Sequence, residues 1–189
     1  ITRCQSVLQA GLPDNDLLLY WPVYDLWMVP GSRESRFTVH HPEWIEGTPC
    51  GEAGQWLIEH GYTFDFVSDR QILATICEQR TLHTQGRSEY RAILVPGAKT
   101  MQVATVQKLF ELARAGATVL VWRSLPEDVP GWHNAARRKQ ELDALLAPIA
   151  AGSSGTAELG RGKVVVADDL EALLEAAGID RETLVDHGL

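Results

Sequence analysis

An excess of positive charge and long apolar runs are both missing from this sequence of 189 residues. Lys and Arg number 17 against 25 Asp and Glu, and the net charge is −8. Nucleic-acid binding depends on clustered Lys and Arg that displace counterions, so this balance argues against a nucleic-acid partner. No apolar stretch approaches the roughly 20 residues that cross a bilayer, so no membrane partner is expected either.

A signal-peptide pattern is missing as well. The chain begins at Ile1, without Met, in the middle of a helical pattern. We therefore expect a piece of a longer protein, and the missing signal leaves the compartment of that protein open.

Cysteines are few, and their spacing excludes two common roles. Cys4, Cys50 and Cys77 form no CxxC pair and no zinc-binding spacing, and their number is odd. We expect three free thiols, two of them on helix faces, and no metal centre built on them.

The glycine-rich motifs of nucleotide-binding proteins are also missing. No GxxxxGK[ST] occurs, and no GxGxxG follows an expected strand. Gly97, Lys99 and Thr100 precede an expected helix, where we interpret Thr100 as its N-cap. His40-His41 with Glu43 and Glu46 has no diagnostic metal spacing and is expected to be a solvated loop. The sequence thus predicts no cofactor and no metal.

Apolar segments of strand length alternate with amphipathic helical segments along the chain. Expected strands cover 17–20, 62–67, 91–95, 117–122 and 163–167, and expected helices cover 2–10, 50–60, 70–79, 101–115, 134–148 and 169–177. A small hairpin is expected over 81–90, a strand-end loop over 20–27, and an extended loop from there to about Pro49. The alternation predicts an α/β fold: a parallel sheet of about five strands with helices on both faces, in a flavodoxin-like three-layer arrangement with strand order 2-1-3-4-5.

Pro96-Gly97, after a buried strand, resembles the oxyanion strand of class I glutamine amidotransferases. Those enzymes need a nucleophilic Cys on the turn after the next strand, together with an activating His. Here that strand continues into Trp122-Arg123-Ser124-Leu125, with no Cys and no Gly-x-Ser-x-Gly elbow. Ser124 is the one candidate nucleophile and His133 the nearest downstream histidine. The sequence thus predicts an amidotransferase-like scaffold with no complete catalytic site.

Aromatic side chains gather after the first expected strand, where ligands of parallel sheets bind. Tyr20, Trp21, Tyr24, Asp25 and Trp27 lie within eight residues. Aromatic faces stack on pyranose rings, and a carboxylate accepts hydrogen bonds from sugar hydroxyls. We interpret these five residues as substrate-facing, with burial against another domain as the alternative. The same two readings apply to two further indoles in or near expected loops, Trp44 and Trp132.

Several segments resemble bacterial α-L-rhamnosidases of glycoside hydrolase family 106, whereas the tail beyond residue 133 matches only in pattern. The segments are Arg3–Gln9, Gly11–Asp16, Tyr20–Trp27, Gly61–Asp69 and Leu125–Gly131. The resemblance implies a domain that follows a catalytic barrel, comparable to the oligomerisation domain of related β-galactosidases. Residues 1–11 would be the closing helix of that barrel, and 12–189 the amidotransferase-like domain. The resemblance also implies that the parent protein is soluble and periplasmic or extracellular.

Two functions of different class follow. The first is a non-catalytic accessory or oligomerisation domain of an α-L-rhamnosidase-like enzyme, with no catalytic residue of its own. Its partners would be the upstream barrel of the same polypeptide, the carbohydrate substrate of that enzyme, and, in the oligomerisation case, further copies of itself. The alternative is an independent hydrolase or amidotransferase-like enzyme that uses Ser124.

Overall fold

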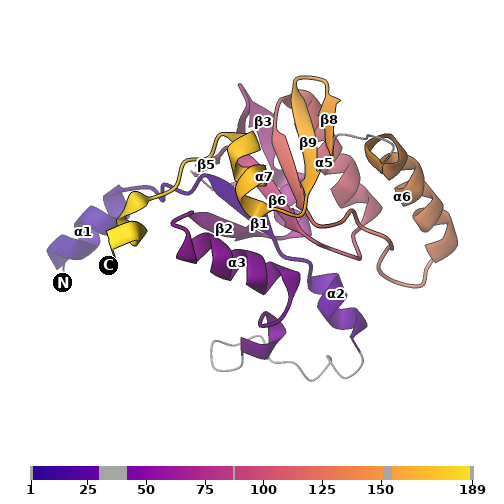
Figure 1. Cartoon of the computed structure of the whole chain (residues 1–189), viewed down its shortest axis with the longest axis horizontal. Coiled ribbons are helices and arrows are strands. Elements are labelled where there is room, and N and C mark those ends of the chain that lie inside the picture. The colour runs from indigo at the N-terminus through magenta and orange to yellow at the C-terminus, as the bar shows by residue number, and fades with distance from the viewer. Residues whose placement is uncertain (1, 30–41, 87, 151–154, 188–189) are drawn as a thin grey trace.

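A computed structural model describes residues 2–29, 42–86, 88–150 and 155–187. Its main sheet has six strands in the order β2-β1-β6-β7-β9-β8 (Figure 1). The parallel strands are β1 (Leu17–Tyr20), β2 (Phe64–Val67), β6 (Ala92–Pro96), β7 (Thr118–Trp122) and β9 (Gly162–Ala167). The expected α/β fold with a mostly parallel sheet is therefore confirmed.

Helices cover both faces of this sheet, each over its own apolar core. One core takes side chains from α3 (Pro49–Glu59) and α7 (Leu170–Ala177). The other takes them from α4 (Asp69–Ala74), α5 (Val103–Ala115) and α6 (Ala135–Ala150). Successive residues of β1 alternate between the two cores, and all four are buried. An uninterrupted apolar run is what a strand covered on both faces requires.

The sheet has one more strand than expected, at the edge next to β9. Residues 156–159 form β8 (Thr156–Leu159), which pairs antiparallel with β9. Its side chains alternate between exposed and half-buried, so no apolar run marked it in the sequence. Gly155, on the turn into β8, has a φ of 66°, a conformation that glycine adopts at little cost.

The expected helix over 70–79 is wrong in its second half. The helix α4 ends at Ala74, and β3 (Ile76–Glu78) follows it. Thr75 and Ile76 are β-branched and fit an extended backbone better than a helix. A three-stranded antiparallel sheet forms from β3, β4 (Thr81–His83) and β5 (Glu89–Tyr90), which confirms the hairpin expected over 81–90.

The loop expected over 20–27 and the extended loop expected from there to about Pro49 are also wrong in part. They contain the helix α2 (Val23–Met28) and a 3-10 turn, η2 (Pro42–Trp44). Asp25 lies in the first turn of α2, where a negative charge is favourable, and its tertiary hydrogen bonds hold the helix in place.

The two ends of the described chain carry short helices. They are α1 (Thr2–Ala10) and the 3-10 helix η3 (Thr183–His187). In Figure 1 both termini lie at the same end of the molecule, away from α6. Every described side chain of α1 is exposed, including Leu8 at 79%.

Candidate functional site

A cleft of about 480 Å³ opens at the carboxyl ends of β1 and β6. The loop after β1 lines it with Trp21 and Pro22, the loop after β6 with Gly97 and Lys99, and the start of α3 with Cys50. The chain goes from β1 outward to β2 and then returns to β6 on the other side of β1. Ligands of parallel α/β sheets bind at such a reversal of strand order, so this cleft is the candidate site.

Asp25 connects α2 to the loop after β6. Its Oδ2 accepts the backbone N–H of Lys99 at 2.8 Å, and its Oδ1 accepts that of Thr100 at 2.7 Å. Both carboxylate oxygens are therefore engaged by the protein, and two amides that could have received a substrate oxyanion are already bound. Thr100, expected as an N-cap, is not one, because α5 starts at Val103 with Gln102 as its N-cap.

Tyr20 lies in the core, away from the cleft surface. Its side chain is 0% exposed, and its hydroxyl donates to Asp69 at 3.2 Å from each carboxylate oxygen. The hydroxyl of Thr105 donates to the same carboxylate at 2.5 Å. Burial, and then the Asp69 carboxylate, raise the pKa of the Tyr20 phenol, so it stays neutral. This buried network joins β1, α4 and α5 behind the cleft.

The remaining aromatic residues of the segment differ in exposure. The hydroxyl of Tyr24 accepts a hydrogen bond from Gln102, and the Tyr24 ring meets Trp27 edge-on at 5.7 Å between centroids. Trp21 packs edge-on against Trp44 at 5.5 Å. Trp27 is 57% exposed, so among the five expected residues it offers the most open aromatic face.

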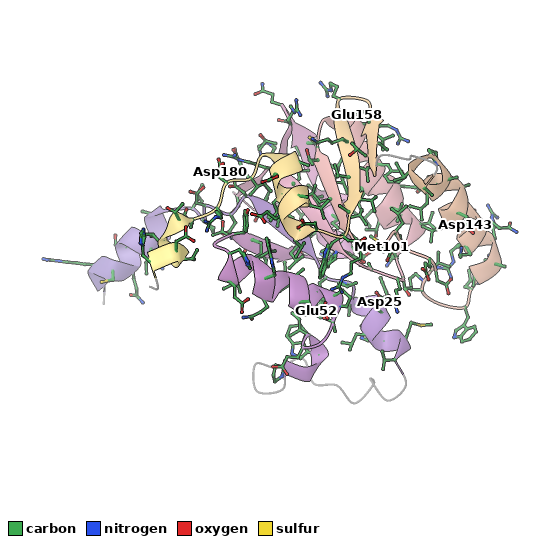
Figure 2. All side chains as sticks on the ribbon, in the orientation of Figure 1. Asp25, Glu52, Met101, Asp143, Glu158 and Asp180 are labelled. Carbon is green, nitrogen blue, oxygen red and sulfur yellow. The ribbon has the colours of Figure 1, made fainter. Side chains whose placement is uncertain are left out.

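Arg123 occupies the turn directly after β7, where an amidotransferase-like scaffold carries its nucleophile. Its φ is 73°, a left-handed conformation that is uncommon outside glycine. Its guanidinium lies 3.8 Å from the centroid of the Trp122 ring and pairs with Glu52 at 2.7 Å. In Figure 2, Glu52 and Asp25 are both labelled in the lower middle of the view, between the termini and α6. Sequence reasoning missed Arg123 because nothing in its local pattern signals a positive φ.

Ser124, the candidate nucleophile, is exposed just beyond this turn. Its backbone N–H donates to the carbonyl of Trp122 at 3.1 Å. The imidazole of His133 lies 3.1 Å from the side-chain nitrogen of Asn134. The structure therefore places the histidine in a surface contact with its own neighbour.

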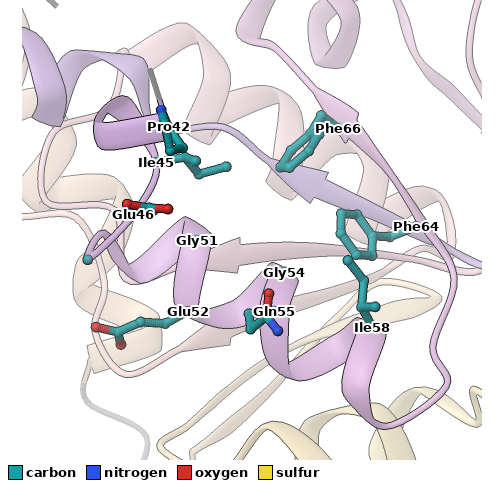
Figure 3. Close-up of a pocket in the computed structure, with 11 residues that line it drawn as sticks. Pro42, Ile45, Glu46, Gly51, Glu52, Gly54, Gln55, Ile58, Phe64 and Phe66 are labelled. Atoms are coloured by element: carbon teal, nitrogen blue, oxygen red, sulfur yellow. The ribbon is translucent and has the colours of Figure 1, made fainter. Parts of the chain in front are cut away.

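A second cleft, of about 500 Å³, lies between α3 and the edge strand β2 (Figure 3). Its walls are apolar: Ile58 is 61% exposed and Phe66 is 46% exposed. A Cβ on Gly51 would lie 2.1 Å from the carbonyl oxygen of Ile45, so glycine there lets the preceding turn pack on α3. Glu52, on its rim, is paired with Arg123.

The cysteines are free, as expected. Cys4 is exposed, Cys50 is buried and Cys77 is half-buried on β3, where a helix had been expected. Burial raises the pKa of the Cys50 thiol to about 12, so it is protonated at neutral pH. Its Sγ lies 3.7 Å from the Tyr20 carbonyl oxygen.

The described ranges hold neither a side-chain cluster for a metal ion nor a membrane-spanning helix. No group of three or more His, Cys, Asp or Glu residues there could hold a metal ion. His40 and His41 lie outside the described residues. None of the described helices is both long and apolar enough to cross a membrane.

Comparison with known proteins places this chain in a family. A family model described as α-L-rhamnosidase matches residues 50–188, which is more than half of the chain. The match includes the tail, expected to agree only in pattern, and leaves out residues 3–27. No curated protein matches.

Among solved structures, the chain is similar to a rhamnosidase from Novosphingobium sp. PP1Y, with 24% identity and a TM-score of 0.54. The alignment covers 64% of this chain and 12% of that one, and at this identity it supports the fold alone. The extent of the family match, by contrast, is decisive: the chain belongs to the α-L-rhamnosidase family, glycoside hydrolase family 106.

Proposed function

We propose that this chain is a non-catalytic accessory domain of a larger α-L-rhamnosidase. The engagement of Asp25 carries the proposal, because both oxygens of the carboxylate in the candidate cleft bind backbone amides. Glycoside hydrolysis uses two carboxyl groups roughly 5 to 10 Å apart on either side of the scissile bond, free to protonate and to attack. An Asp25 that holds α2 against the loop after β6 is not free for either task.

Three other carboxylates, at the starts of α3, α4 and α7, support the same conclusion. Asp69 is 8% exposed and receives the Tyr20 and Thr105 hydroxyls. Glu52 pairs with Arg123. Asp169 caps α7 by accepting the N–H of Glu171 at 2.9 Å. Each has a structural partner, which favours a supporting role for the domain over hydrolysis.

For the architecture, we infer a flavodoxin-like, three-layer and amidotransferase-like domain over 12–189. The parallel strands, numbered along the chain, take the order 2-1-3-4-5, which is that of flavodoxin-like folds. Residues 1–11 would close the preceding barrel. The exposure of Leu8 supports this, because an apolar side chain on a short isolated helix gains stability from a neighbour.

The exposed end of α2 would then border the sugar cleft of the longer enzyme. Trp27→Ala in that enzyme should raise KM for an aryl α-L-rhamnoside about 3- to 10-fold, the loss of roughly 0.5 to 1.5 kcal/mol of aromatic contact, with kcat little changed. Trp27 lies on α2 between two residues that line the candidate cleft, Leu26 and Met28, but does not line it itself. Ile58→Ala is the matched control, because Ile58 is similarly exposed but lies on α3 and lines the second cleft. Unchanged kinetics for Trp27→Ala would exclude the cleft-bordering role.

The compartment we propose for the longer enzyme is the periplasm or the exterior of the cell.

The accessory role itself is tested with the chain alone. We expect no turnover of aryl α-L-rhamnosides or of simple esters above the uncatalysed rate. Ester hydrolysis that disappears in Ser124→Ala would instead establish the alternative, an independent hydrolase.

A further inference from the structure

Trp132 has the most exposed side chain among the large apolar residues that the structure describes, at 96%. It lies in the loop between β7 and α6, within Pro130-Gly131-Trp132-His133. Burying an indole is strongly favourable, so a ligand that covers this ring gains free energy from the contact. The proposed function does not use it, because the candidate cleft is lined by other residues.

The loop around Trp132 is fastened by a single arginine from α6. The guanidinium of Arg138 donates from Nη1 to the Pro130 carbonyl at 2.6 Å and from Nη2 to the Gly131 carbonyl at 2.7 Å. Its Nε donates to the His133 carbonyl at 2.9 Å. Hydrogen bonds from a charged donor are stronger than neutral ones, and the planar fork fixes their geometry.

All four backbone carbonyls of residues 130–133 accept hydrogen bonds. The one carbonyl in 130–133 that Arg138 leaves, that of Trp132, accepts the N–H of Ala135 at 3.3 Å. Gly131 and Asn134 have φ values of 79° and 50°, so Trp132 stands between two left-handed positions. The indole is thus presented on a fixed backbone, and a ligand would not have to order the loop on binding.

The surroundings of Trp132 favour a sugar over a protein partner. The other strongly exposed apolar side chains of the described chain lie on or beside α1, α2, α3, β2, α4, β3 and η3, not on this loop. In Figure 1, α6 lies at the opposite end of the molecule from α1 and η3. Protein interfaces are centred on contiguous apolar area, whereas one aromatic face is enough for a pyranose ring.

Two polar residues whose side chains suit sugar hydroxyls follow Trp132 directly in the chain. His133 and Asn134 are both exposed, and their side chains lie 3.1 Å apart. Amide and imidazole groups both donate and accept hydrogen bonds, which suits the hydroxyls around a pyranose ring.

We propose that Trp132, held by Arg138, is a carbohydrate-binding platform that stacks on a pyranose ring of a saccharide, separate from the cleft beside α2. The inference rests on the proposed function, because a domain of a glycoside hydrolase meets saccharides. Arg138 is a positioning residue, and Trp132, His133 and Asn134 make the contacts.

The test is a titration of the chain with an α-linked rhamno-oligosaccharide, followed by NMR of the indole N–H resonances. The Trp132 resonance is identified by its loss in Trp132→Ala, which should fold normally because the side chain is 96% exposed. We expect this resonance to shift and saturate with a Kd of about 1 to 10 mM, as for a weak single-ring contact. Trp27→Ala, the matched control, should leave the shift unchanged.

Arg138→Lys keeps the charge but loses the fork, so it should weaken binding about 3- to 10-fold by loosening the loop. Loss of affinity in this variant, with an unchanged melting temperature, separates positioning of the indole from stability of the fold.

Two results would overturn the proposal that Trp132 is a carbohydrate-binding platform. One is a Trp132 resonance that does not move with about 10 mM saccharide. The other is a resonance that moves with protein concentration alone, which would make Trp132 a contact between copies of the chain. Neither result bears on the accessory role, which the absence of rhamnoside turnover tests separately.

Discussion

Replacing Asp69 by Ala is expected to lower the free energy of unfolding by about 2 to 5 kcal/mol, because two buried hydroxyls lose their acceptor at roughly 1 to 3 kcal/mol each. Those hydroxyls belong to Tyr20 and Thr105, which are both 0% exposed and have no access to water. Urea unfolding, followed by circular dichroism, measures the change.

Two further variants serve as controls for Asp69→Ala. Asp69→Asn keeps one carbonyl oxygen as an acceptor and should lose less than Asp69→Ala. Asp143→Ala removes an exposed carboxylate that pairs with Lys139 on α6, and should cost about 1 kcal/mol or less. If Asp69→Ala were no more destabilising than Asp143→Ala, the buried network would not be holding β1, α4 and α5 together.

Gly162→Ala is expected to cost roughly 3 kcal/mol, at the upper end for overpacking, because the atoms it meets are backbone. A Cβ at this position would lie 2.2 Å from the carbonyl oxygen of Ala117 and 2.5 Å from that of Ala113. Both belong to the segment that turns from α5 into β7, next to the start of β9. The Ala117 oxygen accepts the N–H of Lys163 at 3.2 Å and the Ala113 oxygen accepts that of Gly116 at 2.9 Å, so moving either oxygen breaks a backbone hydrogen bond.

Gly86→Ala is the control for Gly162→Ala, since its Cβ would meet one atom, Thr84 Oγ1, at an ordinary 3.6 Å. Its effect should stay within about 0.5 kcal/mol. Equal urea midpoints for the two variants would show that the approach of α5 to β9 is looser than the structure has it.

The main sheet could be predicted because its strands carry their signal locally. Leu17-Leu18-Leu19-Tyr20 is apolar at every position, and only a strand covered on both faces buries all four. The strand β8 has no such run, and its existence depends on pairing with β9. The helix expected over 70–79 failed at Thr75, where an extended backbone starts β3 and tertiary pairing with β4 decides the outcome.

The candidate site was predictable in its position but not in its chemistry. The aromatic segment after β1 does lie beside the carboxyl end of the sheet. The partners of Asp25 are 74 and 75 residues away along the chain, so no local pattern reveals that its carboxylate is engaged. The burial of Tyr20 depends in the same way on Asp69, 49 residues away.

The hydrogen bonds from Arg138 to the Trp132 loop could not be predicted from the sequence for a different reason. Its partners are only 5 to 8 residues away, but arginine in a basic run on a helix is usually a solvated residue. The signal was the neighbouring Pro130-Gly131, which breaks the chain into a turn whose carbonyls need donors.

The central proposal is that residues outside 1–189 carry out the hydrolysis that the longer enzyme performs. Hydrolysis of an aryl α-L-rhamnoside tests this proposal most directly. The assay compares the longer enzyme with the chain alone at equal molar concentration. We predict no release of the aryl group by the chain alone, and hydrolysis by the longer enzyme. Hydrolysis by the chain alone, abolished by Asp25→Asn or by Ser124→Ala, would contradict the account.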